Sequence, residues 1–137
     1  LGAAVSVSTP VEKSIADGLL LVGDAARVID PITGGGIANG CIMGKLAGEV
    51  LGDCVQAKDF SEEALKPYEK LWRDELENKL YRNWMAKEKL VTLSDKQLDG
   101  IIETLAGCDI REMNVYNILA ALKQRMPDLV KEFEEFI

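Results

Sequence analysis

The fold is decided by a segment near the start of the chain that reads LLLVGDAARVIDPITGGGI, from Leu19 to Ile37. Its first four residues are large and apolar and are bounded by Gly18 and Gly23, which is the pattern of a short strand covered on both faces. Asp24 follows where this strand would leave the sheet, and ligands of open α/β sheets bind at that edge. We therefore expect the Asp24 carboxylate to accept hydrogen bonds from the hydroxyl groups of a ligand.

Three consecutive glycines, Gly34, Gly35 and Gly36, lead into an apolar helical pattern that begins at Ile37. Glycines let a ligand approach the backbone, and the free N–H groups in the first turn of a helix favour negative charge. Pro31 fits simple turn chemistry and a role in shaping a ligand site equally well. The segment thus offers one acceptor for hydroxyls and one cluster of donors for an anion.

Glycine recurs at every fourth position of the predicted helix, at Gly40, Gly44, Gly48 and Gly52. Each glycine costs about 1 kcal/mol relative to alanine in a helix interior, so the pattern predicts that something packs very close to this face. Packing on a sheet is favoured, and another helix or a ligand remains an alternative. A membrane-embedded helix dimer is disfavoured, because polar residues interrupt a segment too short to span a bilayer.

Amphipathic helical patterns dominate the rest of the chain, and Val5–Thr9 alternates apolar and polar residues as a second short strand would. A capping-box-like pattern over Asp59–Glu62 marks one helix start, with Ser61 or Lys66 near its true beginning, and capping boxes at Ser94 and Asp109 mark two more. The predicted fold is therefore α+β and mainly α-helical, with two short strands. Core packing is favoured over a cofactor-stacking platform for the aromatic residues of one apolar stripe, which consists of Leu65, Tyr68, Trp72, Leu76, Leu80 and Trp84.

The composition excludes several classes of function. The 137 residues include 16 Lys and Arg against 23 Asp and Glu, and the net charge of −7 argues against nucleic acid as a partner. The chain has no histidine, which excludes imidazole catalysis and histidine-ligated metals, and we predict no metal site. Three cysteines without a C-x-x-C pair favour a reduced, cytoplasmic setting. The sequence has no uncharged apolar run of 18 residues, so we expect any membrane contact to be peripheral.

The run from Gly23 and Asp24 through Pro31 to the glycines and Ile37 resembles the second flavin-binding motif of the geranylgeranyl reductase family. That family lies within the FAD enzymes related to p-hydroxybenzoate hydroxylase. The segment 11–17 and residues 68–72 also look like archaeal members, and the resemblance is strongest over residues 18–52. It implies that Asp24 contacts the ribityl or pyrophosphate part of FAD. The cofactor-binding residues that it implies are Gly23, Asp24, Pro31, Gly34, Gly35, Gly36 and Ile37.

The resemblance also implies an activity. Family members reduce isolated C=C bonds of geranylgeranyl chains, in archaea those of digeranylgeranylglycerol phospholipids, so the expected partners are an isoprenoid lipid and an electron donor such as NAD(P)H or a ferredoxin-like protein. Residues 1–57 would then be the last piece of the FAD-binding domain, including two strands from its edge, and residues 58–137 a helical C-terminal region. Gly34–Ile37 would lie beside the isoalloxazine.

The sequence departs from the family pattern in one respect, because the N-terminal G-x-G-x-x-G fingerprint is absent and the chain opens on Leu1-Gly2 without methionine. We therefore expect a C-terminal fragment that binds FAD weakly or not at all by itself and is inactive alone. Two other functions stay open: an FAD-dependent aromatic hydroxylase or halogenase, and a non-catalytic helical module whose glycine strip docks a partner. The residues that perform catalysis, the electron donor and the oligomeric state are not assigned by the sequence.

Overall fold

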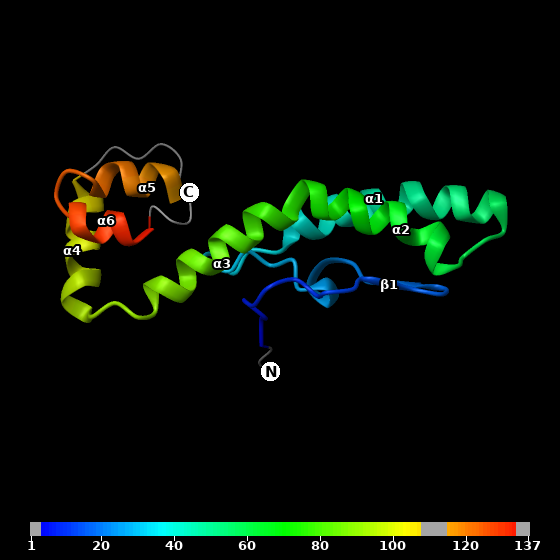
Figure 1. Ribbon diagram of the computed structural model, residues 1–137, viewed down its shortest axis with the longest axis horizontal. Helices are drawn as coiled ribbons and strands as arrows, with labels where there is room; N and C mark the ends of the chain where they lie inside the picture. Colours follow the sequence, from blue (N-terminus) through cyan, green and yellow to red (C-terminus); the bar gives the residue numbers. More distant parts are fainter. Residues whose placement is uncertain (1–3, 108–114, 134–137) are drawn as a thin grey trace. The chain divides into compact units, whose positions relative to one another are not determined.

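A computed structural model describes residues 4–107 and 115–133, and these form two compact units, Leu1–Trp84 and Met85–Ile137 (Figure 1). The structural division falls inside a long helical region. The division expected from the sequence, between residues 57 and 58, concerns the domains of a parent enzyme and stays a prediction. Among the described residues no helix combines the length and the apolar character needed to cross a membrane.

The strands form one small antiparallel hairpin in the first unit. Strand β1 (Ile15–Ala16) pairs with β2 (Leu19–Leu20), and Ala16 lies opposite Leu19. Asp17 and Gly18 form the two-residue loop, and Gly18 has φ +69°. Asp-Gly is a favoured pair in such loops because a positive φ is accessible to glycine. The hairpin therefore follows from a turn signal at Asp17-Gly18 that the pattern of apolar runs does not reveal.

Two strand predictions need correction. Val5–Thr9 forms no strand, since no other strand of the described residues lies beside it to complete a ladder. The strand expected over Leu19–Val22 is only two residues long, and Leu19 is 50% exposed rather than covered on both faces. The predicted class, mainly helical with two short strands, is nevertheless confirmed.

Helices supply the rest of the first unit. A short 3-10 turn, η1 (Gly23–Ala26), precedes the long helix α1 (Ile37–Ala57). Helix α2 (Glu62–Trp72), a π-helical turn η2 (Arg73–Glu77) and α3 (Asn78–Leu90) follow as one continuous helical run. Helices α1 and α2 pack side by side, and β1 packs against α2 (Figure 1).

Of the two starts that the sequence leaves open for helix α2, near Ser61 or near Lys66, the structure has the first. Ser61 Oγ accepts a hydrogen bond from the Ala64 N–H at 3.3 Å. Pro67 lies inside the helix, where its ring removes the bond that would reach the Glu63 carbonyl. Both Glu63 and Pro67 are exposed, so water can satisfy that carbonyl.

The predicted apolar stripe forms the core of the first unit. Tyr68 and Trp72 are fully buried, which confirms core packing for these two aromatics, whereas Trp84 is half-buried and lies against Tyr81. Helix α1 contributes Met43 to the same core. The other members of the stripe that are buried there are Leu65, Leu76 and Leu80.

Buried polar groups tie α2 to the segment that enters the hairpin. Ser14 is fully buried, and its N–H and hydroxyl donate to Glu69 Oε1 at 2.7 and 3.0 Å. The Trp72 indole N–H donates to the Ser14 hydroxyl at 2.9 Å, and the Tyr68 hydroxyl donates to the Leu21 carbonyl at 2.6 Å. These bonds fix an irregular segment against the helix that covers it.

The second unit packs short helices around an apolar core. They are α4 (Asp95–Ala106), α5 (Val115–Leu122) and α6 (Pro127–Phe133). The capping box predicted at Ser94 is confirmed, since the Ser94 N–H donates to Gln97 Oε1 at 3.0 Å, and α4 ends at Gly107 as predicted. The predicted cap at Asp109 lies outside the described residues.

Candidate functional site

The site predicted from the sequence lies where η1 meets the first turns of α1. Gly23 is buried with φ +60°, a conformation that glycine adopts without strain. A Cβ added at Gly23 would lie 3.6 Å from the Cα of Gly40, so the two backbones are in contact. None of the described residues lies within 4 Å of a Cβ built at Gly44, Gly48 or Gly52. Among the residues that the structure describes, the close packing predicted for this glycine face is therefore seen at Gly40 and not at the next three glycines.

Asp24 and Gly36 come together although they are twelve positions apart in the sequence. A Cβ added at Gly36 would lie 2.9 Å from Asp24 Oδ1 and 3.1 Å from Ile29 Cγ1. Both approaches are shorter than ordinary Cβ contacts, so any larger residue at position 36 would displace the carboxylate. The Asp24 residue itself is exposed. The loop thus presents a solvent-accessible carboxylate directly beside a backbone that carries no side chain.

Asp30 organises the loop that carries the glycines. Its Oδ1 accepts hydrogen bonds from the N–H groups of Ile32 and Thr33 at 2.9 and 3.1 Å. Its backbone N–H donates to the Gly35 carbonyl, and its carbonyl accepts from the Gly34 N–H, both at 2.9 Å. This closed turn places Gly34 at φ +70°. Pro31 is buried within it, which agrees with turn chemistry and leaves its second predicted role untested.

The first turn of α1 opens toward solvent. Gly36 is the N-cap residue and has no side chain to satisfy the first N–H groups, and Ile37 is 88% exposed. Unsatisfied N–H groups at a helix start attract anionic or strongly polar groups. Together with Asp24, the loop can accept hydrogen bonds from hydroxyls and donate them to an electron-rich edge.

Two further residues hold this loop and are not predicted from the sequence. The Asn39 side chain, on α1, donates from Nδ2 to the Val28 carbonyl at 2.7 Å. The Asn83 side chain, on α3, donates from Nδ2 to Asp30 Oδ2 at 2.8 Å. Only the helical spacing of Asn83 with Leu76 and Leu80 indicates that it points toward the rest of the unit.

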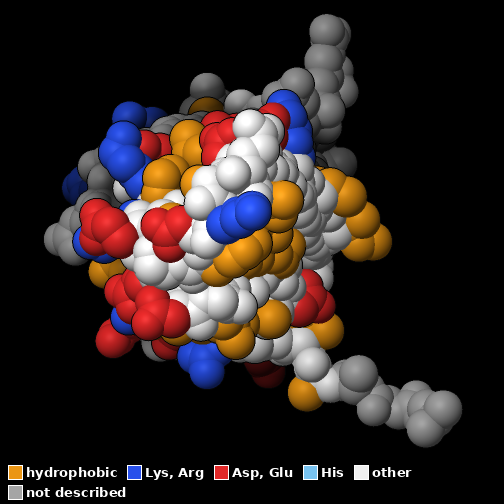
Figure 2. Space-filling view, turned by 90° about the vertical axis from the view of Figure 1, so that its right-hand side faces the viewer, with side chains coloured by type: hydrophobic (Ala, Val, Ile, Leu, Met, Phe, Trp, Pro, Cys, Tyr) orange, Lys and Arg blue, Asp and Glu red, His pale blue; other side chains and the backbone are white. Residues whose placement is uncertain are grey.

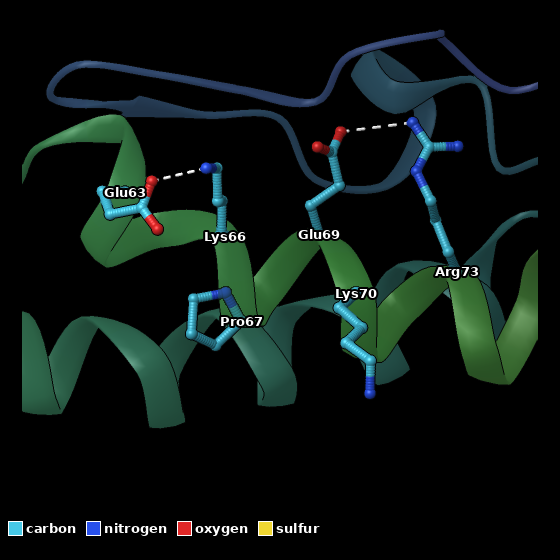
Figure 3. Close-up of a pocket in the computed structure, with 6 residues that line it drawn as sticks. All are labelled: Glu63, Lys66, Pro67, Glu69, Lys70 and Arg73. Atoms are coloured by element: carbon cyan, nitrogen blue, oxygen red, sulfur yellow. Dashed lines mark hydrogen bonds and ion pairs between the residues drawn. The ribbon is translucent and has the colours of Figure 1, made fainter.

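A hollow of about 630 Å³ lies along α2 (Figure 3). Its cations are already paired: Lys66 with Glu63, Arg73 with Glu69, and Lys70 with Asp74, the last at 3.5 Å. Acidic and basic side chains are likewise intermingled on the face seen in Figure 2. This hollow therefore has no cluster of like charges that would attract a ligand of the opposite charge.

The carboxylate in this hollow belongs to the buried network. Burial raises the pKa of Glu69, but hydrogen bonds from Ser14 and Arg73 outweigh burial, so the net effect is a lowered pKa. Burial first, and the Glu69 charge second, raise the pKa of Tyr68 to about 12. Within the described residues no three His, Cys, Asp or Glu side chains are grouped closely enough to hold a metal ion.

Fold and site together define a helical scaffold that presents a carboxylate and a glycine-rich helix start to a ligand with hydroxyl and anionic or polar groups. No family model matches the chain. Among curated proteins, it is 52% identical over 120 residues, 88% of this chain, to a digeranylgeranylglycerophospholipid reductase of Picrophilus torridus, of which it covers 30%. It is 44% identical over 133 residues to the protein of the same name from Thermoplasma volcanium, covering 97% of this chain and 34% of that protein.

A solved structure leads to the same family. A geranylgeranyl bacteriochlorophyll reductase-like protein from Thermoplasma acidophilum matches with a TM-score of 0.85 and 44% identity, over 97% of this chain and 34% of that one. The chain spans about one third of the length of these relatives. The predicted resemblance to the geranylgeranyl reductase family is therefore confirmed. The chain is homologous to about one third of the length of these relatives.

Proposed function

We propose that this chain forms part of a flavin-dependent reductase of geranylgeranyl chains in membrane lipid biosynthesis, and that the loop from Gly23 to Ile37 holds its FAD. The observation that carries the proposal is the contact of the exposed Asp24 carboxylate with side-chain-free Gly36 at an uncapped helix start. The similarity to relatives named as reductases of geranylgeranyl lipids supports the choice of substrate.

The residues present fit the group. A ribityl chain offers hydroxyl donors to Asp24. The Gly34 and Gly35 N–H groups bond within the loop, so the N–H groups at the uncapped start of α1, from Gly36 onward, are the ones that would face the isoalloxazine. A bound FAD would supply two-electron chemistry, the transfer of a hydride to an isolated C=C bond. The chain's own part is to bind and orient: the helix start favours negative charge placed beside it, and the buried Pro31 restricts the backbone of the loop.

The remaining partners belong to the same proposal. The substrate is an isoprenoid lipid, and an external donor such as NAD(P)H or a ferredoxin-like protein would supply the electrons. Contact with the membrane would be peripheral and the setting cytoplasmic. Residues 1–57 would belong to the FAD-binding domain and residues 58–137 to a helical region that follows it.

Titration of the full-length gene product with FAD, followed by flavin fluorescence, tests the proposal. Asp24→Ala should weaken binding about 10- to 100-fold, the range for losing hydrogen bonds to a charged group. Asp53→Ala removes an equivalent exposed carboxylate farther along α1 and should leave binding unchanged. Gly36→Ala should also weaken binding, since its methyl group displaces the Asp24 carboxylate.

Two results would overturn the proposal. The first is a full-length protein that binds no FAD, or one whose FAD affinity is indifferent to Asp24. The second is product analysis that shows oxygen-dependent hydroxylation of an aromatic compound instead of C=C reduction. A third outcome would favour a non-catalytic helical module: Gly44→Leu abolishes association with a partner, whereas Asp24→Ala leaves the function unchanged.

A further inference from the structure

Asp30 uses most of its hydrogen-bonding groups to shape the glycine loop. Its N–H, its carbonyl and its Oδ1 together receive or donate four bonds within residues 30–35. One carboxylate oxygen, Oδ2, remains for a partner from outside the loop. That partner is Asn83, whose Nδ2 lies 2.8 Å away.

The Asn83–Asp30 hydrogen bond joins residues 53 positions apart, and the chemistry of the two groups determines which of them donates. A carboxylate offers only acceptors, so the amide must present its nitrogen. The bond is partly buried, and bonds to a charged acceptor are stronger than neutral ones. Asn83 itself lies one helical turn beyond Leu80, which is 1% exposed, so the amide is held on an anchored part of the helix.

We propose that Asn83 is a positioning residue for the cofactor loop. Through Asp30 it sets the turn from Pro31 to Gly36, and so the place of Gly36 and of the first N–H groups of α1. This inference rests on the proposed FAD site and deepens it, because it assigns the helical region a part in cofactor binding without any contact to the cofactor. Asn83 supplies no chemistry of its own.

An exchange of the two side chains isolates this bond. Asn83→Asp places two carboxylates face to face and removes the donor. Asp30→Asn alone should be mild, since the Asn83 amide can turn over and accept from the new amide nitrogen. The double exchange Asp30→Asn with Asn83→Asp rebuilds the bond with its direction reversed, while the amide oxygen introduced at position 30 can still accept from Ile32 and Thr33.

The experiment measures the FAD dissociation constant of the full-length gene product and the amide hydrogen exchange of residues 31–36 in the FAD-free protein. Asn83→Asp should weaken FAD binding about tenfold, the loss of one hydrogen bond to a charged group, and should speed exchange in the loop. The double exchange should return the FAD dissociation constant and the exchange rate to within about threefold of the wild-type values, because the rebuilt bond replaces most of the lost interaction. Asn78→Asp, at an exposed position of the same helix, adds the same charge and should change neither.

The outcomes separate this inference from the proposed function. If the wild-type protein binds no FAD but Asn83→Asp still speeds loop exchange, the FAD site falls and the positioning role stands. If FAD binds and Asn83→Asp alters neither quantity, or the double exchange recovers nothing, the positioning role is overturned. Asn83→Ala removes the donor without adding charge, and it decides between the same outcomes should Asn83→Asp fail to fold.

Discussion

The two units of this chain are stabilised in different ways. In the first, polar side chains of one helix reach an irregular segment far away in the sequence: Trp72 and Glu69 bind Ser14, and Tyr68 binds the Leu21 carbonyl. In the second, the core consists of apolar side chains such as Leu122 and Phe133 from short helices, and the Ser94 cap joins residues three positions apart.

This difference follows from what each unit must position. A regular helix satisfies its own backbone, so an apolar face is enough to pack it. The segment from Ser14 to Gly36 contains only short regular pieces, and its backbone groups need partners from elsewhere. Side chains of α2 and α1 satisfy some of these backbone groups, and Asn83 of α3 binds the Asp30 carboxylate in the loop that carries the candidate site.

The largest expected effect tests the polar anchor of the first unit. Trp72→Ala should lower the free energy of unfolding by about 4 kcal/mol, because it empties a fully buried site and leaves the Ser14 hydroxyl without its donor. Urea denaturation followed by far-ultraviolet circular dichroism measures it. Trp84→Ala, at a half-buried position, is the matched control and should cost less than half as much. Equal losses at the two positions would contradict the role given to Trp72.

The second prediction concerns the apolar unit. Leu122→Ala should cost about 3 kcal/mol, whereas Leu122→Met should cost less than about 1.5 kcal/mol, because shape and volume are all that the site requires. Leu122 is 3% exposed and Leu98 is 37% exposed, so Leu98→Ala serves as the matched control with a smaller loss. Thermal unfolding of the three variants measures the order of their losses of stability. A Leu122→Met loss as large as that of Leu122→Ala would show that the second unit also depends on a specific geometry.

The sequence predicts the helical part of this architecture better than the irregular part. The spacing of Tyr68, Trp72 and Leu76 correctly indicates the buried face of α2 and of η2, because a helix repeats its environment every three or four residues. Ser94 marks a helix start correctly, and Ser61 is one of the two starts predicted for α2, because capping is a local interaction. Periodicity and capping therefore suffice for elements whose partners lie nearby in the sequence.

The site is predicted in part. Gly23, Asp24 and Gly36 can be proposed because a glycine run beside an acid is visible in one short segment. The structure brings Asp24 and Gly36 into contact, and their role in cofactor binding stays a prediction. Asp30 and Asn83 are missed, since their bond joins positions 53 apart and neither residue type is unusual in a turn or on a helix. Long-range polar contacts leave no periodic signal, and so they require coordinates.

The third prediction uses pH to probe the Ser14 network. The lowered pKa of Glu69 means that its contribution to stability is complete above its ordinary value of 4.5 and is lost as the pH falls through the lower value in the folded state. Glu69→Gln should therefore reduce stability by about 1–2 kcal/mol at neutral pH and by progressively less below pH 4.5.

Urea denaturation of wild type and variant between neutral and acidic pH measures this convergence. Glu75→Gln is the matched control, since Glu75 is exposed on the same helical run. A wild-type advantage that stayed constant down to the lowest pH would mean that the Glu69 charge does not strengthen the network.

The smallest expected effect compares the two faces of α1. Its buried face packs through Met43 and Ala47, whereas Gly48 on the other side is exposed and none of the described residues lies within 4 Å of an added Cβ. Gly48→Ala should therefore stabilise the protein by about 0.5–1 kcal/mol, because alanine loses less backbone entropy in a helix. Gly40→Ala should gain about as much, since its Cβ would lie at an ordinary van der Waals distance, 3.8 Å, from the Cα of Gly23. Thermal unfolding of the full-length gene product measures both changes, and a loss of stability at Gly48 would show that a neighbour covers the glycine face there, as the four-residue repeat predicts.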